Sequence, residues 1–514
     1  MEVFLAEVKD LFEAPLHDKS LHAISRQLQK EFQDKLRASN VCMLPSFNHT
    51  LPTGKETGTI LALDVGGSTF RLALVELTGR QPLQGECTGD GDMEIKQMKS
   101  FPIDESVRSL QGRLFFDWMA CRVEEVLEAD QHRADSKAEG ALPMALAWSF
   151  PIEQTSSKTG SLMPMGKGFL ATKGVEGQDI CELFTSACRA RNLNVALEAI
   201  VNDSSATLLR QAYRDPSTRI SLIIGTGINA AIYLPLNALS KEKFGQREDS
   251  WWHEAKHVLV NTELSMFGKD LWNSTRWDDE LNRNHPLPDF QPLEYKASGR
   301  FLGEIVRLVL VEAIEKGFLF GAEMPRGLHQ TYTLDTGLIG LIESDKSCDL
   351  AASISAFSKA HPLPSGSSAA GSITAQDMRF VRQVSNMVTT RSAAYVATAV
   401  HALWELERDS AAACTSCHSQ EAVSQSEKAE KPKMTVACNG SIMEKYPLFR
   451  TRCQGWLDDL VALSAACDAV RLDGVDASNA GEPEKQVVCI EMAHESSIFG
   501  AAVAAVADAD NFGS

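Results

Sequence analysis

A carboxylate follows an apolar run near the middle of the chain, in the stretch AIVNDSSATLL at residues 199–209. The apolar residues predict a buried strand, and the small hydroxyl residues after Asp203 mark a place where a helix can begin. Asp203 therefore has two interpretations. It is either an N-cap for the first helical turn or a base that accepts a proton from a substrate. The local sequence favours the N-cap, because caps of this kind are common.

Two glycine turns have a similar shape, LDVGGSTFR at residues 63–71 and IIGTGINA at residues 223–230. Each turn lies between two apolar, β-rich runs and predicts a strand–turn–strand hairpin. Consecutive backbone N–H groups in such turns can hold phosphate oxygens, and glycine lets a ligand approach the backbone. The alternative is a plain hairpin turn. Neither segment matches the P-loop or the dinucleotide-binding pattern.

Further polar residues follow or interrupt apolar runs. Ser149 ends a predicted strand, and Lys167 stands between two glycines, where it is either a ligand for a phosphoryl group or hydroxyl, or an exposed loop lysine. The segments NTEL (261–264) and QPLEY (291–295) place amides and carboxylates beside apolar residues. Such a mixture suits a polyhydroxylated ligand, whose hydroxyls need donors and acceptors in a fixed array.

Composition limits the class of protein. The chain has 514 residues, 44% of them hydrophobic, and a formal net charge of -18. This length predicts two or more domains, and the acidic balance argues against nucleic acid or an anionic membrane as the main partner. The first residues do not resemble a signal peptide, and no apolar stretch is long enough to span a bilayer. The twelve cysteines are scattered, so we expect reduced thiols in the cytoplasm.

Predicted strands alternate with predicted helices, which indicates an α/β protein with mixed sheets because of the hairpins. The first thirty-odd residues predict helical structure, and MTVACNGSIMEKYPLF (434–449) predicts a third strand–turn–strand unit. A Ser-, Glu- and Lys-rich segment at about 411–433 predicts a disordered insertion. It contains Cys414-Thr-Ser-Cys417-His418, a match to the haem-attachment pattern that we attribute to chance.

Several motifs resemble those of the hexokinase family, and they occur in that family's order. They include LDVGGSTFRL, SFPIEQ…MGKGF, IVNDSSATLL, IIGTGINA, NTEL..FG, LEYKASGRFLGEIVRLVL, LDTGLIGLIE, VTTRSAA and NGSIMEKYPLF. The resemblance runs from about Leu44 to Ala505 and is strongest to divergent fungal members. It implies a two-lobed, actin-like (ribonuclease H-like) α/β fold with an interlobe cleft.

The resemblance also implies a division of the chain. Residues 1–58 are expected to form N-terminal helices of the large lobe, and residues 59–200 the small lobe. Residues 201–495 are expected to complete the large lobe, and residues 496–514 to form a C-terminal helix that returns to the small lobe.

The implied reaction is ATP-dependent phosphorylation of a hexose or amino hexose at its 6-hydroxyl, with Asp203 as the base. Asp203 and Lys167 are the implied catalytic residues, and both belong to the sugar-binding set. That set is Ser149, Lys167, Asn202, Asp203, Asn229, Glu263, Gln291 and Glu294. The implied nucleotide-binding set is Asp64, Gly66, Gly67, Ser68, Thr69, Arg71, Gly225, Thr226, Gly227, Asn439, Gly440 and Ser441. Mg²⁺ is expected on the ATP phosphates and waters, one of which Asp64 would hold, without a direct protein ligand.

The chain departs from the family pattern on the nucleotide side. Ser68-Thr69 stand where the family has Thr-Asn, and Asn439 stands where it has Asp. Ser496-Ser497-Ile498 replace a Gly-Ser-Gly turn, so side chains there are expected to crowd the adenine. These changes support an alternative function, a weak or inactive hexokinase-like sugar sensor.

The chain also departs on the sugar side. Met165-Gly166 replace Trp-Thr, and Leu264-Ser265-Met266 replace Trp-Gly-Ala. The loss of two large aromatic side chains makes room for a larger substituent, which favours N-acetylglucosamine as a substrate. In the alternative, Met165 and Leu264 refill the vacated volume and glucose stays preferred.

Overall fold

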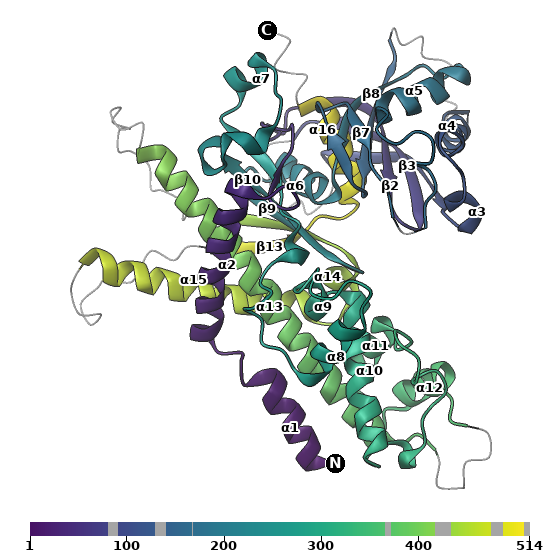
Figure 1. The fold of residues 1–514 in the computed structure, drawn as a ribbon, viewed down its shortest axis with the longest axis vertical. Helices are drawn as coiled ribbons and strands as arrows, with labels where there is room; N and C mark the ends of the chain where they lie inside the picture. Colours follow the sequence, from purple (N-terminus) through teal and green to yellow (C-terminus); the bar gives the residue numbers. More distant parts are fainter. Residues whose placement is uncertain are drawn as a thin grey trace.

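The computed structural model describes residues 1–80, 91–128, 140–166, 168–364, 372–416, 433–473 and 487–507. These residues form two lobes, each built on its own mixed sheet (Figure 1). The α/β prediction and the two-lobed prediction are therefore confirmed.

The small lobe contains a sheet of order β4-β3-β2-β5-β8. Its strands are β2 (Thr57–Val65), β3 (Thr69–Thr78), β4 (Met93–Pro102), β5 (Leu142–Trp148) and β8 (Val195–Val201). Helices α3 (Glu105–Arg108), α4 (Arg113–Glu128) and α5 (Ile180–Ala190) and the hairpin β6 (Ile152–Gln154)–β7 (Gly160–Leu162) belong to the same lobe. On the other face, α16 (Ser496–Ala507) packs against the sheet and against α6 (Asp203–Arg214) (Figure 1).

The large lobe contains a sheet of order β1-β11-β10-β9-β12-β13. Its strands are β1 (Leu44–Pro45), β9 (Thr218–Ile224), β10 (Ile228–Pro235), β11 (His257–Asn261), β12 (Lys433–Asn439) and β13 (Val487–Met492). β12 runs parallel to β9 and β13, and the other pairs are antiparallel. Both predicted glycine hairpins are confirmed, as β2–β3 and β9–β10.

Helices make up most of the large lobe, around the long central helix α13 (Ala375–Ser416) (Figure 1). The other α-helices are α1 (Glu2–Glu13), α2 (Asp18–Ala38), α7 (Asp249–Glu254), α8 (Arg276–Asn284), α9 (Glu294–Ala297), α10 (Gly299–Glu315), α11 (Thr336–Ser344), α12 (Ala351–Ala360), α14 (Ser441–Lys445) and α15 (Phe449–Asp473). Short 3-10 helices are η1 (Leu236–Ala238), η2 (Lys241–Phe244), η3 (Leu264–Met266) and η4 (Phe320–Ala322).

The prediction of N-terminal helices is confirmed by α1 and α2, which are separate because Pro15 lies between them and a proline inside a helix removes a hydrogen bond. Two other predictions about single elements are wrong. MTVACNGSIMEKYPLF is a strand followed by α14, since the chain turns at Gly440, whose φ is 105°. The range predicted for the insertion overlaps described elements at both ends, because α13 continues through three alanines to Ser416 and Lys433 belongs to β12. Residues 417–432 lie outside the described residues.

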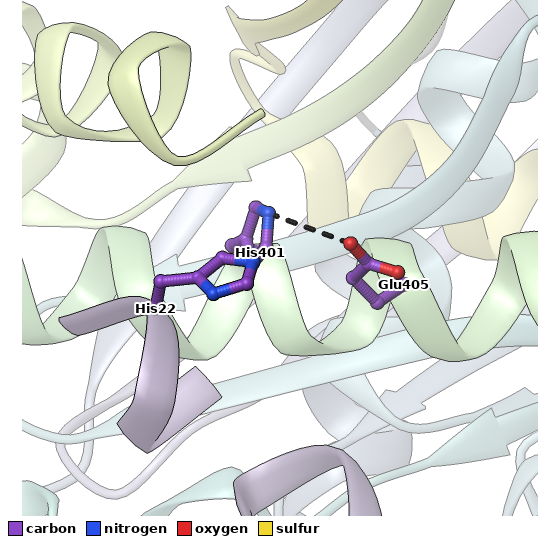
Figure 2. A group of neighbouring side chains, drawn as sticks. All are labelled: His22, His401 and Glu405. Atoms are coloured by element: carbon purple, nitrogen blue, oxygen red, sulfur yellow. Dashed lines mark ion pairs between the residues drawn. The ribbon is translucent and has the colours of Figure 1, made fainter. Parts of the chain in front are cut away.

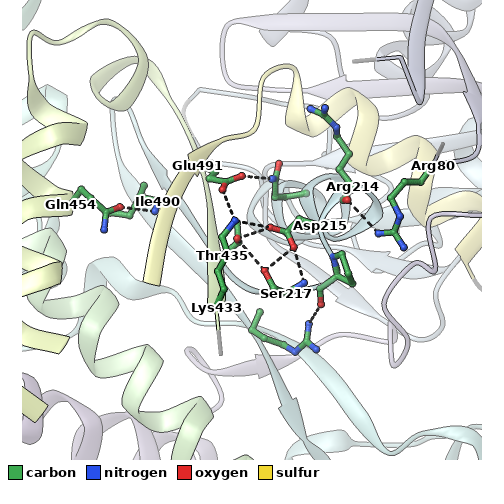
Figure 3. Close-up of polar contacts among 12 residues, drawn as sticks. Arg80, Arg214, Asp215, Ser217, Lys433, Thr435, Gln454, Ile490 and Glu491 are labelled. Atoms are coloured by element: carbon green, nitrogen blue, oxygen red, sulfur yellow. Dashed lines mark hydrogen bonds and ion pairs between the residues drawn. The ribbon is translucent and has the colours of Figure 1, made fainter. Parts of the chain in front are cut away.

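A polar network lies at the C-terminal end of α6, where the two lobes meet (Figure 3). Asp215 Oδ2 accepts a hydrogen bond of 2.6 Å from Thr435 Oγ1 on β12. Lys433 Nζ lies 3.0 Å from Glu491 Oε1 on β13. Arg80, which follows β3 in the small lobe, donates to the Arg214 carbonyl over 3.3 Å. The network therefore ties the end of α6 to both lobes.

Gly500 allows α16 to pack closely on α6. A Cβ atom at Gly500 would lie 1.9 Å from the carbonyl oxygen of Ala206, in the first turns of α6. We expect Gly500→Ala to lower the free energy of unfolding by about 3 kcal/mol, because backbone atoms must separate to admit the methyl group. Urea denaturation measures this change.

Gly455→Ala is the matched control, since Gly455 is also helical and a Cβ there meets nothing within 4 Å. It is expected to stabilise the protein by up to about 1 kcal/mol through helix propensity. Equal effects of the two substitutions would show that the contact between α6 and α16 is not tight.

Candidate active site

The site begins where β8 ends and α6 starts. Asn202 is the N-cap of α6, and its Oδ1 accepts a hydrogen bond of 2.9 Å from the backbone N–H of Ser204. The interpretation of Asp203 as the N-cap is therefore wrong, because the cap is its neighbour and Asp203 is the first helical residue. Its Oδ1 accepts from the same N–H over 2.8 Å. A helix N-terminus favours negative charge, so the carboxylate stands in a suitable place for an anion.

A chain of amides and a carboxylate lies beside this helix start. Asn229 Nδ2 on β10 donates to Asn261 Oδ1 over 2.9 Å, and Asn261 Nδ2 donates to Glu263 Oε1 over 2.8 Å. Ser204 Oγ also lies 3.5 Å from Asn261 Oδ1. Asn261 thus joins two residues of the predicted sugar set, Asn229 and Glu263, and approaches Ser204 at the start of α6, yet sequence reasoning did not include it in that set. The NTEL segment was a signal for it, but only the pairing of β10 with β11 places it at the centre.

Glu263 is held in an unusual conformation, with φ 52° and ψ 50° in the left-handed region. Burial raises the pKa of its carboxyl above the ordinary value of 4.5, and the hydrogen bond from Asn261 opposes this shift. A non-glycine residue with this backbone conformation is strained, and such strain is common at functional sites.

We expect sugar binding to weaken in acid at a pH above the usual range of a glutamate. As a predicted sugar ligand, ionised Glu263 would accept hydrogen bonds from hydroxyls with both oxygens, and protonation through its raised pKa would reduce that capacity. The Michaelis constant for sugar should rise as pH falls through this pKa, whereas in Glu263→Gln it should not change there. The stability of the fold should change with pH in the opposite direction. Because the pKa of Glu263 in the folded protein is raised above 4.5, this residue favours folding most strongly below pH 4.5, and the contribution is lost as pH rises through the raised pKa. Initial rates and melting temperatures across pH check both signs.

Glu294 connects the sugar residues to the second glycine turn. The backbone N–H of Ile228 donates to Glu294 Oε2 over 3.0 Å. A Cβ atom at Gly227 would lie 2.7 Å from the same oxygen, so a side chain at this position would displace the Glu294 carboxylate. Nearby, Gln291 Nε2 donates to Ser265 Oγ over 3.3 Å. The predicted residues of β10, of the segment after β11 and of α9 are thus brought together.

Ser149 follows β5, and its backbone N–H donates to the Val65 carbonyl over 3.4 Å, next to the first glycine turn. No hydrogen bond given for the described residues connects it to the Asn261 group. Lys167 lies outside the described residues. Its neighbours Gly166 and Gly168 have φ values of 68° and 82°, which L side chains rarely adopt.

The first glycine turn is closed by a hydrogen bond of 3.0 Å from Gly66 N–H to the Thr69 carbonyl. Arg71, predicted as a phosphate ligand, pairs with two carboxylates: its Nε lies 3.0 Å from Asp64 Oδ2, and another guanidinium nitrogen lies 2.7 Å from Glu495 Oε2. Burial raises the pKa of Asp64 above its ordinary value, although the Arg71 charge opposes the shift. Glu495 is a residue that sequence reasoning missed, and no local signal marks it.

The second glycine turn lies beside the Asn439–Ser441 turn, because β9 and β12 are neighbours and Asn439 is opposite Ile223. A Cβ atom at Gly440 would lie 2.4 Å from the Ile224 carbonyl oxygen, so glycine is required for this approach. Thr226 and Ser441 are exposed, which leaves their hydroxyls accessible to a ligand.

A pocket of about 680 Å³ adjoins these two turns. Gly225, Thr226 and Ser441 of the predicted nucleotide set belong to its wall. Arg300 and Lys445 also line it and supply two positive charges that sequence reasoning did not include. Cationic side chains beside glycine turns suit a phosphorylated ligand.

The altered C-terminal turn, Ser496–Ile498, does not line this pocket. Ser496 is fully buried, shares a hydrogen bond of 2.8 Å with Thr207 Oγ1 on α6, and accepts a hydrogen bond from Asn439. Neither Ser496 nor Ile498 belongs to the pocket wall. The expected crowding at this pocket is therefore not observed.

Met165 and Leu264, which replace the family's tryptophans, are also buried. Met165 packs in the core of the small lobe and is 3% exposed, and Leu264 packs in the core of the large lobe and is 0% exposed. Both side chains fill interior space, as the refilling alternative requires.

Comparison with known proteins agrees with these features. Two family models described as hexokinase match residues 6–213 and 219–507. The chain belongs to the hexokinase family. It is 26% identical to a hexokinase of Kluyveromyces lactis over 443 residues, which cover 85% of this chain and 82% of that protein. It is also 26% identical to hexokinase-1 of Saccharomyces cerevisiae, with 93% of this chain and 88% of that protein covered.

The same fold occurs in a solved hexokinase of Schistosoma mansoni complexed with glucose. The TM-score is 0.72 at 24% identity, covering 98% of this chain and 99% of that one. The family identity supports a kinase that phosphorylates a hexose and uses ATP. No helix within the described residues is long and apolar enough to cross a membrane.

Proposed function

We propose that this hexokinase transfers the γ-phosphoryl group of Mg-ATP to the 6-hydroxyl of a hexose, with Asp203 as the general base. The observation that carries the proposal is the joined set of Asn202, Ser204, Asn261, Asn229 and Glu263 beside the Asp203 carboxylate. Such a set offers several donors and acceptors in fixed positions, which a sugar with many hydroxyls requires.

In the proposed reaction the protein forms no covalent bond with either substrate. The 6-oxygen attacks the γ-phosphorus, the bond to the β-phosphate oxygen breaks, and Asp203 accepts the hydroxyl proton. The products are the sugar phosphate and ADP. Catalysis therefore depends on placing the hydroxyl between Asp203 and the phosphate.

The proposed site for ATP is the pocket next to the second glycine turn, and the exposed Thr226 and Ser441 and the cations Arg300 and Lys445 there support this choice. Mg²⁺ carried on the phosphates neutralises their charge. Asp64, expected to hold a water of that ion, already accepts hydrogen bonds from Arg71.

We expect Arg300→Gln to raise the Michaelis constant for ATP about tenfold, because one charge-assisted contact is lost. The backbone N–H of Arg300, which donates to the Thr226 carbonyl over 3.3 Å, is unchanged by the substitution. The Michaelis constant for sugar should stay the same. Initial rates with each substrate varied separately check this prediction, and a change in the sugar constant alone would contradict it.

Glucose is the proposed substrate in preference to N-acetylglucosamine, and the burial of Met165 and Leu264 supports this choice. The test measures kcat/KM for glucose, mannose, fructose, glucosamine and N-acetylglucosamine with Mg-ATP. A higher value for N-acetylglucosamine than for glucose would overturn the preference. If no sugar causes ADP release, the alternative function as a sugar sensor is favoured instead. Thr69 and Asn439 support that alternative, because they depart from the family pattern in the predicted nucleotide-binding set.

A further inference from the structure

A group of buried and half-buried polar side chains lies between α2, α13 and α15, outside the residues of the proposed active site. His22 comes from α2, and His401 and Glu405 lie one turn apart on α13, so that all three side chains face one another (Figure 2). His401 and Glu405 are 0% and 1% exposed at their side chains. The proposed hexokinase reaction uses none of these residues.

The distances match a site for a small cation after slight side-chain rotation. One ligand atom from each residue can be chosen so that all lie within 4.8 Å of one another, and His401 Nε2 is 3.8 Å from Glu405 Oε1. Tetrahedral zinc with bonds of about 2.1 Å places its ligand atoms about 3.4 Å apart. Ser464 Oγ on α15 lies 3.0 Å from His22 Nε2 and 3.2 Å from His401 Nε2, within reach of a fourth position.

One of the histidines has a partner that fixes its ring. Ser25 Oγ lies 2.7 Å from His401 Nδ1 and orients the ring. A partner of this kind on the second ring nitrogen is usual for metal-bound histidine.

Glu405 presents one oxygen to the histidines. Its Oε2 is held by Arg408 at 2.6 Å and by Arg26 at 3.5 Å, and this leaves Oε1 on the side of the histidines. Oε1 is buried and has no hydrogen bond of normal geometry. Asp468 and Asp409 balance the charge of Arg408, with contacts of 2.9 Å and 3.8 Å. A buried carboxylate oxygen without a well-aligned donor is costly, and a cation would satisfy it.

We propose that His22, His401 and Glu405 bind a zinc ion, with Ser464 Oγ or a water as the fourth ligand. The ion would fasten the N-terminal helix α2 to the central helix α13. Two imidazoles and one carboxylate form a ligand set typical of zinc.

Zinc content of the full-length protein tests this proposal. The protein is dialysed against a chelator, then against buffered Zn²⁺, and measured by mass spectrometry of the metal. We expect about one ion per chain and a higher melting temperature with Zn²⁺. His22→Gln, at a half-buried position, should reduce the zinc affinity by more than about 100-fold. Loss of a residue that only hydrogen-bonds to a metal ligand would reduce the affinity less than this. His253→Gln, at an exposed position on α7, is the matched control and should keep the ion.

Co²⁺ absorption separates this site from the cysteines. Binding at the proposed site gives visible bands of a four-coordinate ion without thiolate charge transfer. Absence of binding, equal binding by His22→Gln, or a thiolate band at the first equivalent would each overturn the proposal. Should His22→Gln fail to fold, the Co²⁺ spectrum of the unmodified protein decides, because it distinguishes nitrogen and oxygen ligands from sulfur.

Discussion

Asp203→Asn is expected to lower kcat by about 10²–10⁴-fold, because an amide cannot accept the proton of the sugar hydroxyl. The fold should be retained, since Asn202 supplies the N-cap of α6 and an asparagine at position 203 can still accept from the Ser204 N–H. Sugar should still raise the melting temperature. Steady-state ADP release and thermal unfolding measure the two effects.

Asp215→Asn is the matched control at the other end of the same helix. Asp215 contacts Lys433 and Thr435. Burial raises the pKa of Asp215, but the hydrogen bonds from Thr435 and Ser217 outweigh burial and hold this pKa below its usual value. This substitution should lower the melting temperature and leave kcat nearly unchanged. The opposite pattern, with kcat lost only in Asp215→Asn, would assign Asp203 a structural role.

Arg71→Met is expected to lower the free energy of unfolding by about 3 kcal/mol, because it leaves the buried Asp64 carboxylate without its partner. This value is at the lower end for buried ion pairs, since the Arg71 side chain is 28% exposed and water screens part of the loss. The pair with Glu495 is lost as well, which loosens the contact between the first glycine turn and the start of α16. Urea denaturation gives the free energy.

The pH dependence of this loss identifies its cause. Without Arg71 the pKa of Asp64 rises further, so protonation at low pH removes the unpaired charge. The difference between Arg71→Met and the unmodified protein should therefore be largest at neutral pH and shrink as pH falls. Asp64→Asn combined with Arg71→Met should recover much of the stability. A difference that grows in acid would contradict a buried-charge origin.

Sequence predicts the hairpins well, because these depend on local signals. Apolar runs with glycine turns mark β2–β3 and β9–β10, whereas the two-lobed arrangement follows from the resemblance to a known family. Helix boundaries are less well predicted, because one or a few residues decide them. Pro15 separates α1 from α2, and the alanines near the end of α13 extend that helix to Ser416.

The site is predictable only in part. The residue types of the proposed sugar set follow from motifs, but the position of Asn261 between Asn229 and Glu263 depends on how two strands pair. Glu495 lies 424 residues from its partner Arg71, and such a contact leaves no trace in local sequence. The burial of the Met165 and Leu264 side chains bears on the proposed sugar preference. It depends on how the core of each lobe packs, which the local sequence does not specify.

ADP release with glucose and with 6-deoxyglucose, both with Mg-ATP, tests the central claim most directly. The two sugars differ only in the hydroxyl that Asp203 is proposed to deprotonate. We predict ADP and a 6-phosphorylated product with glucose, no ADP above background with 6-deoxyglucose, and a raised melting temperature with both. ADP release that is equal with both sugars, or absent with glucose although glucose raises the melting temperature, would contradict phosphoryl transfer to the 6-hydroxyl.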